Sequence, residues 1–122
     1  MTIDQIRAYA LSLPETTEDP HFDKISFRIR GKILVTVPSD KAHAHIFVDD
    51  EHREMAVNVY ANFAEVLMWG KRPSGVRIRL ADVKGEADRR AVEELILNAW
   101  QRKAPKRLVK AFNAANMKDA GQ

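Results

Sequence analysis

An alternation of apolar and polar residues over residues 25–37 predicts a β-hairpin. In the first half of this segment, apolar side chains occupy every second position, and this period of two is typical of a strand with one buried face. The apolar residues are Ile25, Phe27 and Ile29, and the polar residues between them are Ser26, Arg28 and Arg30. Gly31 and Lys32 then supply the turn.

The register of this hairpin depends on the length of its loop. The second half of the segment carries three alternating apolar residues, Ile33, Val35 and Val37. A two-residue loop of Gly31 and Lys32 would turn these three outward, whereas an odd-numbered loop keeps them on the same face as Phe27. We therefore expect the odd-numbered loop, with Gly31 in a bulge.

A period of 3.6 predicts helices at both ends of the chain. Thr2 and Gln5 occupy the positions of a capping box before the apolar stripe Ile3, Ile6, Ala10 and Leu13, and Pro14 ends this first helix. The strongest stripe follows Glu86 and consists of Val92, Leu95, Ile96, Ala99 and Trp100. Pro105 ends that helix and begins another, whose stripe is Leu108, Val109 and Phe112.

Weaker patterns fill the middle of the chain. Residues 15–23 follow neither period, so we expect an irregular connection held in place by Phe22. A strand is expected over residues 44–48, followed by a short helix over residues 51–57 with Asp50 as its N-cap.

Two further strands are expected over residues 66–69 and 76–80. The segment between them has glycine at both ends and proline inside, which predicts a loop over residues 70–75. In the second strand, alternation places Arg77 and Arg79 on the outward face.

These elements predict an α/β domain, more closely an α+β sandwich. We expect an N-terminal helix, a mainly antiparallel sheet of about five strands, and C-terminal helices packed on one face of that sheet. The other face would be open to solvent or to a partner. Residues 1–112 would form this single domain, and residues 113–122, which are small and polar, a flexible tail.

Composition and charge narrow the function only moderately. The 122 residues carry a net charge of +3, which permits binding to polyanions without requiring it. There is no cysteine, so disulfides, thiolate metal sites and a cysteine nucleophile are excluded. Because no apolar run typical of a signal peptide or a membrane span occurs, we expect a cytoplasmic protein without a membrane partner.

Several pieces of the chain, taken in order, resemble the MmcQ/YjbR-like family. They are Leu13-Pro14 after the first helix, the strand pair over residues 27–32, Trp69 followed by residues 75–80, and Ala104-Pro105-Lys106-Arg107-Leu108. The resemblance extends to about residue 112 and implies a frataxin-like (CyaY-like) sandwich, typical of small bacterial domains. It also implies DNA binding through a double-wing arrangement of β-hairpins.

The resemblance also allows a metal hypothesis to be judged. The related frataxin group binds iron through acidic residues on its first helix, but the first helix here carries only Asp4. His43, His45 and His52 lie near Asp49 and Asp50 in sequence, yet spacing dictates no third ligand for the two strand histidines. We interpret them as surface histidines and expect neither a metal nor another cofactor.

The candidate nucleic-acid-binding residues are the cations of the two hairpins and of the last helix break. They are Arg28, Arg30, Lys32, Lys71, Arg72, Arg77, Arg79, Lys106 and Arg107. Alternatively, the hairpin cations could simply be solvated charges that protect the sheet from aggregation, and the last two could complement helix dipoles.

The sequence therefore predicts a DNA-binding protein that contacts phosphates and carries out no catalysis. No nucleophile with a recognisable acid or base partner occurs, so we expect no enzyme. Trp69 could stack on a base or fill the core. The alternative function is a binding module for a protein or a small acidic ligand, using the open sheet face and a pocket beside the Trp69 loop.

Overall fold

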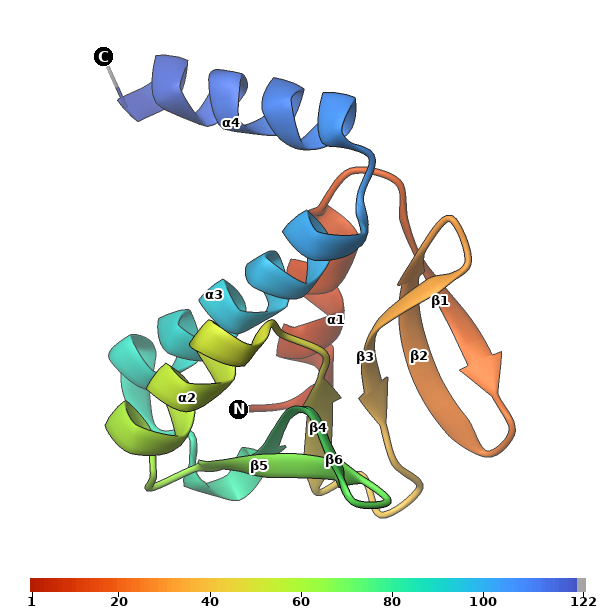
Figure 1. Cartoon of the computed structure of the whole chain (residues 1–122), viewed down its shortest axis with the longest axis vertical. Coiled ribbons are helices and arrows are strands. Elements are labelled where there is room, and N and C mark those ends of the chain that lie inside the picture. Colours follow the sequence, from red (N-terminus) through yellow and green to blue (C-terminus); the bar gives the residue numbers. More distant parts are fainter. Residues whose placement is uncertain (121–122) are drawn as a thin grey trace.

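One antiparallel sheet organises the molecule, with strand order β1-β2-β3-β4-β6-β5 (Figure 1). The computed structural model describes the backbone of residues 1–120 and the side chains of these residues except His21 and residues 118–120. The elements are α1 Ile3–Ser12, β1 Thr16–His21, β2 Lys24–Ile29, β3 Lys32–Val37, β4 His43–Ile46, α2 Asp50–Val59, β5 Ala64–Trp69, β6 Arg72–Arg79, a 3-10 turn Leu80–Asp82, α3 Gly85–Lys103 and α4 Lys106–Ala120.

Helices cover one face of the sheet. Figure 1 shows α1 and α3 side by side against β1–β4, and α2 lies against β5 and β6. The core between these layers contains fully buried Phe27, Ile46, Ile78 and Trp100. This confirms the predicted α+β class with helices from both ends of the chain, although the sheet has six strands and not five.

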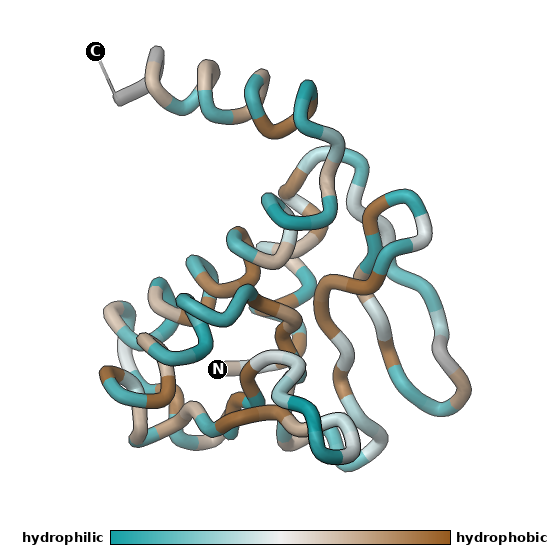
Figure 2. The backbone as a smooth tube through the Cα atoms, viewed as in Figure 1, coloured by the Kyte–Doolittle hydropathy of each residue, from teal (hydrophilic) through white to brown (hydrophobic). Residues whose placement is uncertain are grey.

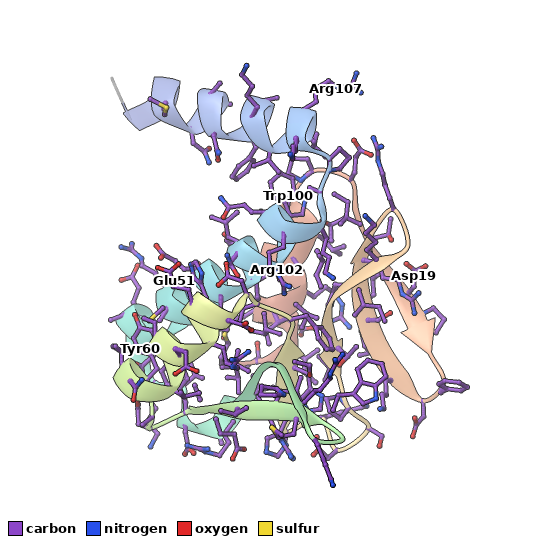
Figure 3. The ribbon with its side chains drawn as sticks, viewed as in Figure 1. Asp19, Glu51, Tyr60, Trp100, Arg102 and Arg107 are labelled. Carbon is purple, nitrogen blue, oxygen red and sulfur yellow. The ribbon has the colours of Figure 1, made fainter. Side chains whose placement is uncertain are left out.

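The predicted helical stripes are the ones that are buried. In α1 the capping box is complete, because Gln5 N donates to Thr2 Oγ1 at 3.1 Å and Thr2 N donates to Gln5 Oε1 at 2.9 Å. Every stripe residue of α3 is buried. Trp100, labelled in Figure 3, also donates from Nε1 to the Pro14 carbonyl oxygen at 3.0 Å, which ties α3 to the end of α1.

The irregular connection predicted over residues 15–23 is wrong. Thr16–His21 form the edge strand β1, which pairs with all of β2. Phe22 does not anchor this segment in the core, because its side chain is 92% exposed. An edge strand needs no apolar face and tolerates Pro20, so the pattern of apolar residues gave no sign of it.

The β2–β3 loop also differs from the prediction. It has two residues, Arg30 and Gly31, and both have positive φ, +49° and +80°, as a type I′ turn requires. The bulge lies in β3, where Leu34 is skipped between the pairs Phe27–Val35 and Arg28–Ile33. Val35 and Val37 therefore share the face of Phe27 as expected, but Ile33 does not.

The predicted 70–75 loop is mostly strand. Only Gly70 and Lys71 form the turn, and β6 begins at Arg72. A second bulge skips Ser74 between the pairs Leu67–Gly75 and Met68–Pro73. Gly75 is needed beside this bulge, because a Cβ atom there would overlap the backbone carbonyl of Ile46 at the end of β4. Missing side-chain volume thus lets β6 approach the chain that leaves β4.

The sequence predicted Asp50 as the N-cap of α2, but the N-cap is Asp49. Its carboxylate accepts the His52 backbone N–H at 2.7 Å and the His52 Nδ1 at 2.8 Å. The buried Asn98 of α3 bonds both ways, accepting from Asp49 N and donating to Asp49 Oδ2, each at 3.1 Å. The cap therefore also joins α2 to α3.

The remaining bounds shift by a few residues. The predicted strand 44–48 is β4, His43–Ile46, and the predicted helix 51–57 is α2. The segment 113–122, expected as a flexible tail, is helical up to Ala120 as part of α4, and residues 121–122 lie outside the described residues. The flexibility of that segment stays a prediction.

Replacing Gly75 should destabilise the fold through overlap and not through backbone conformation. We expect Gly75→Ala to lower the free energy of unfolding by about 3 kcal/mol, because the displaced atoms are backbone. Gly31→Ala is the control, since its Cβ would meet open space and the cost is only the positive φ, about 1 kcal/mol. Urea unfolding of both variants measures the difference, and equal losses would contradict the overlap argument.

Asp49 should contribute a pH-dependent part of the stability. Burial opposes its charged form, but the hydrogen bonds from His52 and Asn98 outweigh burial and lower the pKa of Asp49 from 3.8 to about 2. This difference corresponds to about 2.5 kcal/mol, but the side chain is 39% exposed and solvent screens it, so we expect about 1 kcal/mol.

Since the folded pKa lies below the unfolded one, this stabilisation is present above pH 4 and is lost as the pH falls towards 2. Asp49→Asn should therefore unfold more easily than wild type at pH 7, and the gap should close below pH 4. Asp50→Asn is the control, because the Asp50 side chain is 89% exposed. A gap for Asp49→Asn that does not change with pH would refute the assignment.

Candidate nucleic-acid interface

The face of the sheet opposite the helices carries one polar row across all six strands. Cross-strand pairing aligns Asp19, Ser26, Thr36, His45, Arg77 and Glu65. Each of these residues alternates along its strand with side chains of the core face, so the row lies on the side without helices. We call this side of the sheet the open face.

The outward arginines of β6 are partly neutralised on this face. Arg77 Nε lies 3.9 Å and Arg79 Nη1 3.7 Å from the same Glu65 oxygen. Arg79 also donates to Asp82 Oδ2 at 3.0 Å and to the Ala61 carbonyl at 3.1 Å. The prediction that both arginines face outward is confirmed, but Arg79 is held by a carboxylate, and Arg77 has a longer contact with Glu65.

A hollow of about 330 Å³ lies between the open face and the end of the β5–β6 hairpin, and we call it the open-face pocket. Its floor consists of Lys24, Ile33, Thr36, His45 and Phe47. Its other wall is the hairpin itself, with Leu67, Met68, Trp69, Gly70 and Ser74. Trp69 is 77% exposed, so it lies at the rim and does not fill the core.

His45 is the polar group of the pocket floor with an unmet hydrogen bond. Its Nε2 atom is buried and has no hydrogen-bond partner among the described residues. Burial lowers the pKa of His45, and the positive charges of Arg77 and Lys24 lower it further. The imidazole is therefore neutral at pH 7, with one nitrogen that donates and one that accepts.

The structure distributes the nine predicted cations over four places: the β2–β3 turn, the open face, the β5–β6 turn and the start of α4. Arg30 lies in the β2–β3 turn and not on the strand face. Its Nε donates to Glu15 Oε1 at 3.0 Å. That hydrogen bond lowers the pKa of the Glu15 carboxyl. Arg28 does lie on the open face, and its Nε donates to Ser26 Oγ at 3.0 Å.

The remaining predicted cations are exposed. Lys71 and Arg72 lie at the β5–β6 turn, which Figure 2 shows as a hydrophilic tip beyond a more hydrophobic strand. Within the described part of the chain, neither forms a salt bridge, and the same holds for Lys32 at the start of β3. Lys106 and Arg107 begin α4, and Figure 3 shows Arg107 at the end of the molecule away from this hairpin.

The histidines do not converge on a metal site. His43 Nδ1 lies 2.9 Å from Asp40 Oδ2, and His52 Nδ1 is hydrogen-bonded to Asp49 Oδ1 at the start of α2. Among the side chains that the structure describes, no group of three or more His, Asp or Glu residues is placed to hold a metal ion. In the same described part, no helix is long and apolar enough to cross a bilayer.

Sequence reasoning missed two members of the pocket. Lys24 precedes Ser26 and Arg28 on the outward side of β2, and this alternation could have identified it. Phe47 follows β4 and continues the side of His45, but its position in the pocket depends on the β5–β6 hairpin, which is distant in sequence. No local signal could have placed it there.

The protonation of His45 tests this description of the pocket. We expect its NMR titration midpoint to lie below 6.5, because burial and Arg77 both oppose the imidazolium. In Arg77→Met the midpoint should rise, since one positive neighbour is removed while the bulk of the side chain is kept. A wild-type midpoint at or above 6.5, or no change in the variant, would be incompatible with the buried, positively charged environment.

Comparison with known proteins identifies the family of this chain. No curated protein and no solved structure was found to match it, so the frataxin-like relationship stays a prediction. The family model described as YjbR matches residues 11–102, which include every strand of the sheet and nearly all of α3. The match thus covers the open face and its pocket, and the chain belongs to the YjbR family.

Proposed function

We propose that this protein binds nucleic acid, DNA in the first instance, through the β5–β6 hairpin and the open face of its sheet. The observation that supports this most is the hairpin end, where Lys71 and Arg72 are exposed without salt bridges in the described structure, next to the exposed Trp69. Cations beside an aromatic ring are the usual combination in surfaces that follow a nucleic-acid backbone.

The open face extends this surface behind the hairpin. Lys24 lies at the pocket and Arg28 lies farther along the same strand face. Three of the predicted arginines, Arg30, Arg77 and Arg79, contribute less here, because each has a carboxylate within 4 Å. We therefore assign the principal phosphate contacts to the hairpin tip.

The proposed binding is weak and sensitive to salt. The net charge of the whole chain is only +3, so its long-range attraction to a polyanion is small, and the phosphate contacts that hold the complex weaken as salt rises. The role is also proposed to be non-catalytic. The chain has no cysteine, and its sequence contains no nucleophile motif with a partner base.

A second candidate function is the binding of a small acidic ligand. The observation that favours it is the open-face pocket, whose volume of about 330 Å³ lies within the range of small-molecule sites. Lys24 would pair with the acidic group. This candidate differs from the first in needing no charge at the hairpin tip, so substitutions at Lys71 and Arg72 would leave it unaffected.

A matched pair of double variants tests the proposal by fluorescence anisotropy of labelled DNA at low and near-physiological salt. Lys71→Ala with Arg72→Ala should weaken binding about tenfold at low salt and reduce the slope of log affinity against log salt by about 2. Lys106→Ala with Arg107→Ala removes the same charge from α4 and should bind as wild type does. Equal losses in both variants, or no binding by the wild type at low salt, would rule the proposal out.

A further inference from the structure

The open-face pocket combines features that two larger hollows of the described surface lack. A hollow of about 490 Å³ lies along α4 and another of about 400 Å³ lies between Tyr60 and α3, but neither contains a buried polar atom without a partner. The open-face pocket is lined by His45, whose Nε2 is such an atom, and by the aromatic side chains of Phe47 and Trp69.

The wall of this pocket exposes large apolar side chains to water, which is unfavourable as long as nothing covers them. Trp69 is 77% and Met68 50% exposed, although both are large and apolar. A tryptophan at a rim offers its ring face to a planar group, and stacking on it covers apolar area that otherwise faces water. A flat aromatic ligand therefore suits this wall.

The floor offers a polar complement to the edge of such a ligand. A buried nitrogen without a partner is unfavourable, and Nε2 would gain one if the His45 ring turned towards a ligand atom in the pocket. Because burial and Arg77 keep His45 neutral, its ring can accept or donate one hydrogen bond. The edges of nucleobases carry both donors and acceptors, whereas a purely hydrocarbon ring carries neither.

The charge around the pocket selects the rest of the ligand. Lys24 lines the pocket, and Lys71 and Arg72 lie just past Trp69 at the turn. We propose that the pocket receives one unpaired base of single-stranded nucleic acid, stacked on Trp69 and hydrogen-bonded by His45, with the flanking phosphates on these three cations. This inference rests on the proposed function and specifies its substrate class.

A preference for single strands follows from this arrangement. A base in a duplex is already stacked and paired, and placing it in the pocket would require unstacking it first. A base in a single strand is free to move onto Trp69. Duplex DNA would then contact the hairpin cations only and gain nothing from the pocket.

The test compares two oligonucleotides of about twelve nucleotides with the same number of phosphates, one of thymidine and one of abasic sites. Wild type should bind the thymidine strand about tenfold more tightly than the abasic strand, because only the former has a base to stack. Trp69→Leu should remove this difference and leave abasic binding unchanged, whereas Trp69→Phe should keep part of it. His45→Leu should also reduce thymidine binding alone.

Intrinsic fluorescence provides a second measurement. The chain has two tryptophans, and Trp100 is fully buried, so quenching by the thymidine strand reports on Trp69 and should disappear in Trp69→Leu. A short-wavelength emission maximum from Trp100, typical of a buried indole, shows that the variant is folded. Because Trp69 is exposed, its replacement removes no core contact.

The outcomes separate this inference from the proposed function. Equal wild-type affinity for the two strands, or a Trp69→Leu variant that loses affinity for both alike, overturns the base pocket and leaves phosphate binding in place. No binding of either strand at low salt overturns both proposals. A thymidine preference that depends on Trp69 and His45, with abasic binding that depends on Lys71 and Arg72, supports both.

Discussion

Burial of a single face of the sheet beneath α1 and α3 is the interaction on which the rest of this structure depends. The apolar stripes of both helices and the alternating apolar residues of β2, β3, β4 and β6 meet there, and Trp100 near the end of α3 is fully buried with them. No helix covers the opposite face in Figure 1, so its polar row must be satisfied by its own neighbours, by solvent or by a ligand. The β5–β6 hairpin supplies part of that cover, and the pocket lies beneath it.

Two kinds of cation result from this arrangement. Those inside the sheet, such as Arg77 and Arg79, share Glu65 and help to hold β5 and β6 together. Those at the hairpin tip have no such structural partner in the described residues. Surface charge alone therefore does not identify a binding site, and the carboxylates that the fold brings nearby decide which charges remain available to a ligand.

The sequence was sufficient where a local pattern determines the structure. The stripe of α3, the capping box at Thr2 and the outward direction of Arg77 all follow from periods within one element. It was insufficient where the cause lies elsewhere in the chain. β1 has no apolar face, so no periodic pattern marks it. The bulge at Leu34 keeps Val35 and Val37 in the core although the turn has only two residues. The ion pair of Arg30 with Glu15 joins residues that are distant in sequence. The pocket combines β2, β3 and β4 with a hairpin that begins only at Ala64, after the whole of α2, so no short window of sequence contains it.

The edge strand β1 has a consequence for how the molecule can associate. A sheet normally grows when another strand adds to its free edge, but Pro20 removes a backbone donor from β1, and charged or hydroxyl-bearing residues flank it. Lateral growth on that side is therefore blocked, and a chain of these molecules joined edge to edge through β1 cannot form a regular ladder.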